Sequence, residues 1–102
     1  EAEMTILEAI RHNPNDIQTH MEYLRIARET LNGARYLAEL EKAHERFPES
    51  AEILWQLARR YHMVERMPVT AAILYQRLLE TAPETSVLGK QAKMELIKIQ
   101  NF

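Results

Sequence analysis

The stretch LWQLARRYHMVERMPVTAAILYQRLLETAP, from Leu54 to Pro83, decides the fold of this chain. Its first half places apolar side chains three and four residues apart, which is the spacing of one face of a helix. Its second half repeats that spacing from Ala71 to Leu78. Pro68 suits the first turn of a helix, where its missing N–H costs nothing. The stretch therefore predicts two amphipathic helices joined by a short turn.

Prolines recur along the chain at a nearly constant interval. Pro14 and Pro48 are 34 residues apart, and Pro48 and Pro83 are 35 residues apart. A residue that precedes proline is pushed out of the helical region, so we expect a helix to end before each of them. An interval of this length is typical of repeat proteins, in which helical units stack because none can bury its apolar face alone. We therefore expect an array of helical hairpins.

The same signals predict six helices and no strand, because no segment alternates with period two. Asn32 and Gly33 predict a turn, since both residue types tolerate a positive φ. The expected capping residues are Asn15 and Asp16, Glu49 and Ser50, and Thr85 and Ser86. The expected helices span residues 2–12, 17–31, 34–46, 51–64, 68–81 and 87–100. In the second of these helices the apolar members are Met21, Leu24, Ile26 and Leu31.

The stretch quoted above resembles a tetratricopeptide repeat (TPR) of the bacterial type. That family places two large residues, a small one and an aromatic on its first helix. The matching residues here are Leu54, Leu57, Ala58 and Tyr61. Its second helix carries a small residue, an aromatic, another small residue and then proline. Here these are Ala71, Tyr75, Leu78 and Pro83, with leucine where alanine is usual. The resemblance implies an all-α, right-handed superhelix of antiparallel helical hairpins.

The resemblance extends over nearly the whole chain, with one weaker unit. Residues 1–14 resemble the second helix of a partial repeat, through Ala2, Ile6, Ala9 and Pro14. In the middle unit Leu24 and Tyr36 replace small residues and Ala27 replaces an aromatic, an exchange that could conserve core volume. The resemblance thus divides a single domain, 1–102, into four segments: 1–14, a repeat at 15–48, a repeat at 49–83 and a C-terminal helix at 84–102.

Half-a-TPR (HAT) repeats, which occur in RNA-processing scaffolds, are the nearest competing family. The segment from Ala71 to Leu78 would suit that family as well, but the regular 34-residue spacing favours the TPR interpretation. RNA binding with a strong salt dependence would support the HAT interpretation. The formal net charge of −2 gives no support for a nucleic-acid partner.

Composition narrows the class of protein further. With 102 residues the chain has the length of one domain. It contains no cysteine, which excludes disulfides, thiol catalysis and thiolate zinc sites, and suits the cytosol and the bacterial periplasm equally. No apolar run approaches the roughly 20 residues that span a bilayer, so we expect no membrane insertion. The chain begins with Glu1 rather than methionine, so we expect an excised domain or a processed form.

The TPR resemblance also implies a binding site, because the first helix of each pair lines a concave groove in that family. Arg25 and Arg59 are 34 residues apart and would occupy equivalent places on successive repeats. They could pair with an acidic or C-terminal carboxylate, with Trp55 as an anchor. The candidate groove residues are Met21, Arg25, Arg28, Trp55, Gln56, Arg59, His62 and Lys90, and Gln91 and Met94 belong to the same groove.

The non-functional alternative is that these side chains do not take part in binding. The two arginines would then be solvated or paired with Glu22, Glu29 or Glu52, and Trp55 would belong to the core. The lysine and asparagine clamp of the chaperone-tail binders within the TPR family is absent from the matching positions, so the sequence does not support that partner.

No pattern of catalytic or metal-binding residues stands out. Glu41 and His44 share a helix face, but di-iron bundles need a second such pair and further glutamates. The remaining histidines have no local ligand partners. No nucleophile lies in a glycine-flanked elbow, and two glycines cannot form a phosphate-binding loop. We therefore expect no enzyme activity, no cofactor and no metal.

The two terminal helices leave a second function open. The helix at 2–12 lacks the first helix of its own repeat, and the helix at 87–100 is apolar over more than one face. Terminal repeats normally carry a polar outer face. The sequence thus favours a protein-binding scaffold or adaptor with a peptide in its groove. The alternative is a structural or oligomerisation segment of a longer TPR protein, with contacts through its terminal helices.

Overall fold

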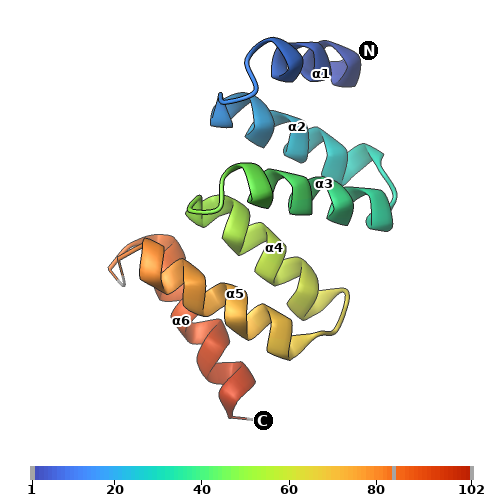
Figure 1. Ribbon diagram of the computed structural model, residues 1–102. Helices are drawn as coiled ribbons and strands as arrows, with labels where there is room; N and C mark the ends of the chain where they lie inside the picture. The colour runs from blue at the N-terminus through green and yellow to red at the C-terminus, as the bar shows by residue number, and fades with distance from the viewer. Residues whose placement is uncertain (1, 84, 102) are drawn as a thin grey trace. The chain divides into compact units, whose positions relative to one another are not determined.

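The computed structural model describes residues 2–83 and 85–101, with their side chains from residue 6 onward. Every regular element in these ranges is an α-helix, and the described residues form no strand. The predicted all-α class is confirmed. The chain divides into two compact units, Glu1–Phe47 and Pro48–Phe102, and three of the labelled helices belong to each (Figure 1).

The first unit contains α1 (Ala2–His12), α2 (Ile17–Thr30) and α3 (Gly33–Arg46). Helix α2 packs against both of the others, so that consecutive helices form antiparallel hairpins. Asp16 is the N-cap of α2, and its carboxylate accepts a hydrogen bond from the backbone N–H of Gln18 at 3.1 Å. This bond satisfies one of the N–H groups that the first turn of a helix leaves without a partner.

The carbonyl oxygen of Pro14 ties the elements of the first unit together. It accepts hydrogen bonds from His20 Nε2 at 2.9 Å and from Arg46 Nε at 3.1 Å. The His20 ring also meets the ring of Phe47 edge-on, with 4.9 Å between the centroids. The loop after α1, the first turn of α2 and the end of α3 are therefore held at one point.

The second unit contains α4 (Ala51–Met63), α5 (Pro68–Thr81) and α6 (Val87–Gln100). Helix α5 packs against α4 and α6, and α6 also reaches α4. Ser50 and Ser86 are the N-caps of α4 and α6, and their hydroxyls accept hydrogen bonds from backbone N–H groups of the first turn. All six helices begin and end within one residue of the predicted ranges.

Each helix from α2 to α6 buries one stripe of side chains. In the first unit the buried apolar residues are Tyr23, Leu24, Ala27, Tyr36, Leu40 and Ala43. In the second unit they are Ile53, Leu54, Leu57, Ala58, Ala71, Leu74, Tyr75, Leu78, Ala92 and Leu96. Truncating a fully buried leucine or tyrosine of this kind to alanine costs about 2–5 kcal/mol of stability.

The buried residues of α2 include only one of the four apolar residues named from the sequence. Leu24 is buried, whereas Met21, Ile26 and Leu31 are half-buried. Tyr23 and Ala27 are buried as well. The buried side of the helix follows His20 at intervals of three, four and seven residues, and Met21 lies beside it. In α1, Ala9 is exposed, and the side chain of Ala2 lies outside the described residues.

The prediction for Asn32 and Gly33 was wrong in its backbone geometry. Asn32 has a φ of −69° and is the N-cap of α3, with its side-chain oxygen accepting from the N–H of Arg35 at 2.9 Å. Gly33 begins the helix, and no described glycine has a positive φ. Leu31 and Asn32 are both extended, which suffices to reverse the chain. A positive φ occurs instead at Arg66, at 57°, between α4 and α5.

Gly89 is required by close packing and gives a test of this arrangement. A Cβ at this position would lie 2.1 Å from the carbonyl oxygen of Pro83, a backbone atom that cannot move aside cheaply. In an open helix Gly→Ala is stabilising by roughly 0.5–1 kcal/mol. We expect Gly89→Ala to be destabilising instead, by about 1–3 kcal/mol in urea denaturation.

Gly33→Ala is the matched control, since Gly33 also lies in the first turn of a helix and its φ is not positive. That variant should leave the free energy of unfolding unchanged or raise it by several tenths of a kcal/mol. An equal change in the free energy of unfolding for Gly33→Ala and Gly89→Ala would contradict the close packing at Gly89.

Candidate functional site

The second unit has a hollow of about 220 Å³ between α4 and α6. Trp55 and Arg59 line it from α4, where a spacing of four residues places both on one side of the helix. Gln91, Met94 and Glu95 line it from α6 in the same manner. The hollow thus combines a large aromatic, a thioether, an amide and two opposite charges.

Arg59 connects the two walls. Its guanidinium carbon lies 5.4 Å from the centre of the Trp55 ring, which is within the range of a cation–π contact. Its Nη1 donates to Glu95 Oε1 at 2.7 Å, the short distance of a charge-assisted hydrogen bond. The aromatic ring, the cation and the carboxylate therefore form a continuous polar and aromatic surface.

Glu95 is the centre of the charges at this site. Besides Arg59, its carboxylate contacts Lys98 Nζ at 3.0 Å and lies 3.6 Å from His62 Nδ1. Only 13% of its side chain is exposed. Burial by itself raises the pKa of Glu95, but the hydrogen bond from Lys98 and the charges of Lys98, Arg59 and His62 outweigh it, so the pKa is lowered.

Tyr75 of α5 forms the floor beside this cluster. Its ring is fully buried, with its centroid 5.8 Å from that of Trp55 and 5.9 Å from that of His62. Its hydroxyl lies 3.2 Å from His62 Nδ1. Burial raises the pKa of Tyr75, and the neighbouring Arg59 only partly opposes that shift. Tyr75 therefore stays neutral at physiological pH and fixes the position of His62.

The structure places the predicted groove residues in both units. Met21, Arg25 and Arg28 lie on α2, where Met21 is half-buried and the two arginines are exposed. Arg25 forms a bidentate ion pair with Glu22 of the same helix, as the non-functional alternative anticipated. This pair raises the pKa of Arg25 and lowers that of Glu22, in both cases mainly through the hydrogen bond between them.

The predicted residues of the second unit lie on two helices. On α4, Trp55 and Arg59 contact each other, Gln56 is half-buried and His62 joins the cluster around Glu95. Lys90 is exposed on α6 and does not line the hollow.

Sequence reasoning missed Glu95, the partner of Arg59. The non-functional alternative named Glu52, which lies on the same helix as Arg59, among the possible partners of the two arginines. One signal could have found the true partner, since Glu95 follows Gln91 by four residues and hence shares its side of α6.

Comparisons with known proteins do not assign the chain to a family: no family model matches it, and no curated protein is significantly similar to it. In the described part of the chain no helix is long and apolar enough to cross a membrane. Within the same residues, no three histidine, aspartate or glutamate side chains gather as they would around a metal ion. The interpretation of the hollow in the second unit therefore depends on its lining residues and their contacts.

The lowered pKa of Glu95 gives a prediction for the pH dependence of stability. A carboxylate whose pKa is lower in the folded state contributes stability above its unfolded pKa of about 4.3, and loses it as the pH falls through the folded pKa. We expect Glu95→Gln to lower the free energy of unfolding at pH 7 by about 1–3 kcal/mol, the range for hydrogen bonds to charged groups. The difference from the wild type should shrink below about pH 4.

Urea denaturation between pH 2.5 and 7 measures this difference. Glu80→Gln, an exposed position on α5, is the matched control and should show no loss at any pH. A loss for Glu95→Gln that is the same at pH 3 and pH 7 would show that the ion-pair cluster does not contribute as described.

Proposed function

We propose that this chain is a non-enzymatic scaffold or adaptor of the TPR type, which binds a peptide or protein segment along α4 and α6. The observation that supports this most is the hollow between those helices. Its walls offer an aromatic ring, an exposed methionine and an arginine, which are residue types enriched at protein interfaces. Tryptophan and arginine in particular dominate binding hot spots.

The charges around the hollow indicate what such a segment would carry. Arg59 is balanced by Glu95, but Lys98 contacts the same carboxylate and Lys90 is exposed on the same helix. These four side chains leave a positive excess. An anionic group on the bound segment would be favoured, and the guanidinium of Arg59 retains N–H donors beyond the one that Glu95 accepts.

A peptide library displayed on phage and selected against the folded chain supplies a ligand of defined sequence. The selected peptide, labelled with a fluorophore, is titrated with the wild type and the variants Trp55→Ala and Arg59→Ala. We expect each variant to weaken binding about 30-fold or more, because interface hot spots are worth about 2 kcal/mol or more.

Gln76→Ala and Arg35→Ala are the matched controls, since both residues are exposed and neither lines the hollow. Circular dichroism and urea denaturation verify that the variants remain folded. Undiminished binding by folded Trp55→Ala would refute a peptide site at this hollow.

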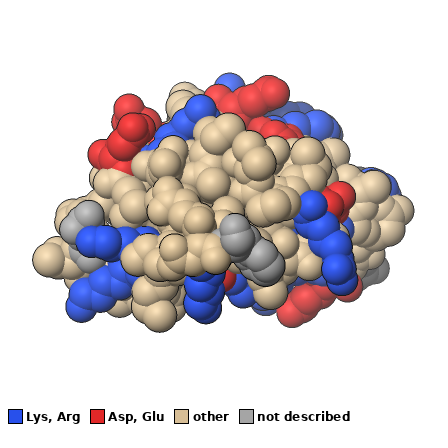
Figure 2. All heavy atoms as spheres, turned by 90° about the horizontal axis from the view of Figure 1, so that it is seen from below, with Lys and Arg blue, Asp and Glu red and all other residues tan. Residues whose placement is uncertain are grey.

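A second function, self-association through a terminal helix, rests on the exposed side chains of α6. Val87, Met94 and Ile97 are all exposed, and their spacing of seven and three residues places them on one side of the helix. In the view of Figure 2 most lysine, arginine, aspartate and glutamate side chains lie toward the edges, and uncharged residues occupy most of the middle. Neighbouring exposed apolar side chains, such as these three on α6, are typical of contacts between chains.

Light scattering across a concentration series tests this second function. If α6 is an interface, the mass should rise from monomer to dimer with concentration, and Ile97→Lys should abolish the rise because it buries a charge. Ile73→Lys on α5, an equally exposed isoleucine, is the matched control and should leave the dimer intact. A monomer at every concentration would exclude the interface and leave the peptide site as the proposal.

A further inference from the structure

The first unit has a pocket of its own, separate from the hollow between α4 and α6. It has a volume of about 200 Å³ and opens between α1 and α3, with α2 as its floor. Leu7 and Ile10 line it from α1, Tyr23 and Leu24 from α2, and Ala43 from α3. Its walls are therefore apolar, and all of them belong to the same compact unit.

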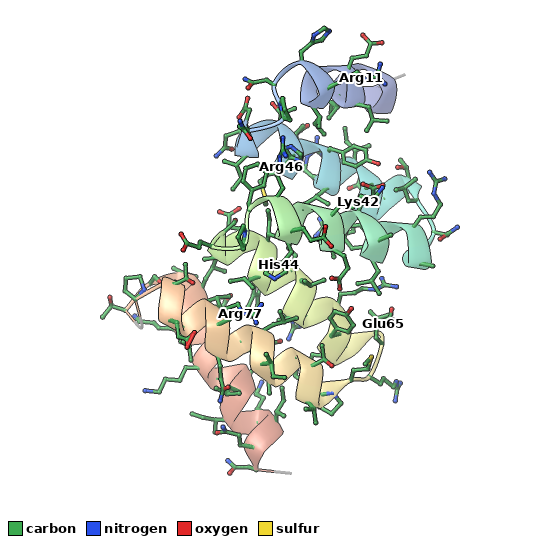
Figure 3. All side chains as sticks on the ribbon, in the orientation of Figure 1. Arg11, Lys42, His44, Arg46, Glu65 and Arg77 are labelled. Atoms are coloured by element: carbon green, nitrogen blue, oxygen red, sulfur yellow. The ribbon has the colours of Figure 1, made fainter. Side chains whose placement is uncertain are left out.

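The rim of this pocket is predominantly basic. Lys42 and Arg46 lie on it, one turn apart on α3 (Figure 3). The Lys42 side chain is 72% exposed, and its ion pair with Glu39 is long, at 3.5 Å. Arg46 uses its Nε to donate to Pro14, which holds the guanidinium in place while its other N–H groups stay available. Two cations and one carboxylate thus surround an apolar opening.

This pocket does not coincide with the predicted groove. On α2 it is lined by His20, Tyr23 and Leu24, which lie on one side of the helix. Met21 and Arg25, the groove candidates, lie about 100° further round the same helix, since each residue turns an α-helix by that angle. A ligand in the pocket and a segment along the groove side would therefore contact different faces of α2.

The size of the pocket selects its occupant. Pockets for drug-sized ligands measure roughly 300–1,000 Å³, so this one is too small for them. An apolar cavity of about 150 Å³ holds a benzene ring, so a volume of 200 Å³ suits the ring of one phenylalanine. The basic rim complements acidic residues on either side of that ring. We propose that the first unit binds a protein segment in which a phenylalanine is flanked by aspartate or glutamate.

Nuclear magnetic resonance on the ¹⁵N-labelled chain tests this proposal with a synthetic probe, Gly-Asp-Asp-Phe-Asp-Asp-Gly. We expect saturable shifts of the amide signals of α1 and α3, including Leu7 and Lys42. Lys42→Glu should weaken binding about fivefold, since a charge pair at a rim is worth up to about 1 kcal/mol. Arg35→Glu makes the same change of charge on α3 outside the pocket and should have little effect.

Two altered probes separate the parts of the proposal. Replacing Phe by Ser should abolish binding if the apolar pocket holds the ring, and replacing the aspartates by lysines should weaken it strongly. Shifts confined to Trp55 and its neighbours would overturn the proposal, because the probe would then bind the second unit. Binding of octanoate but not of the peptide, or concentration-dependent shifts at the pocket without any probe, would also overturn it in favour of a small carboxylate or a second copy of the chain.

Discussion

Helices of 11–14 residues are too short to persist alone in water, and this constraint governs everything else in the molecule. Each helix exists because its apolar stripe lies against the helix next to it in the sequence. Within each unit, short loops deliver a helix antiparallel to the preceding one, and Asp16 and Ser86 cap the helices that follow two of these loops. Because contacts between near neighbours in sequence dominate within each unit, a residue that functions on one helix is positioned mainly by the adjacent helices.

The site in the second unit shows how function can be built on that scaffold. Helix α5 packs against α4 and α6. Its residue Tyr75 contacts the rings of both Trp55 and His62. The ion pair between Arg59 and Glu95 then joins the two outer helices on the solvent side. A site of this kind has little freedom to rearrange, and preorganised side chains lose less conformational entropy when a ligand binds.

Local signals in the sequence were enough to predict the helices, because prolines and capping residues act within a few residues of where they stand. The core of the second unit was also predictable. Leu54, Leu57 and Tyr75 follow the spacing of a single apolar helix face, and all three are buried. In α2 two stripes overlap, and only packing decides that Tyr23 is buried and Met21 is not fully buried. The chain does reverse at Asn32, but without the expected positive φ, because asparagine suits an N-cap as well as a turn.

The pairing of charges was the least predictable part of the site. Arg59 and Glu95 are 36 residues apart, and several carboxylates lie at comparable spacings. Spacing alone restricts the partners to one side of a helix but does not choose among them. The choice depends on how α4 and α6 approach each other across α5, which is a property of the packed unit. The first-unit pocket was unpredictable for the same reason, since its walls come from three helices.

The carbonyl oxygen of Pro14 has a consequence for how the first unit opens. Because it accepts from both His20 and Arg46, fraying of the last turn of α3 breaks one of the two hydrogen bonds that hold the loop after α1. Terminal turns ordinarily open independently and exchange their amide hydrogens quickly. Here the start of α2 and the end of α3 share one acceptor, so the opening of one weakens the support of the other. We therefore expect the amides at the start of α2 and the end of α3 to be protected to a similar degree, although they are far apart in the sequence.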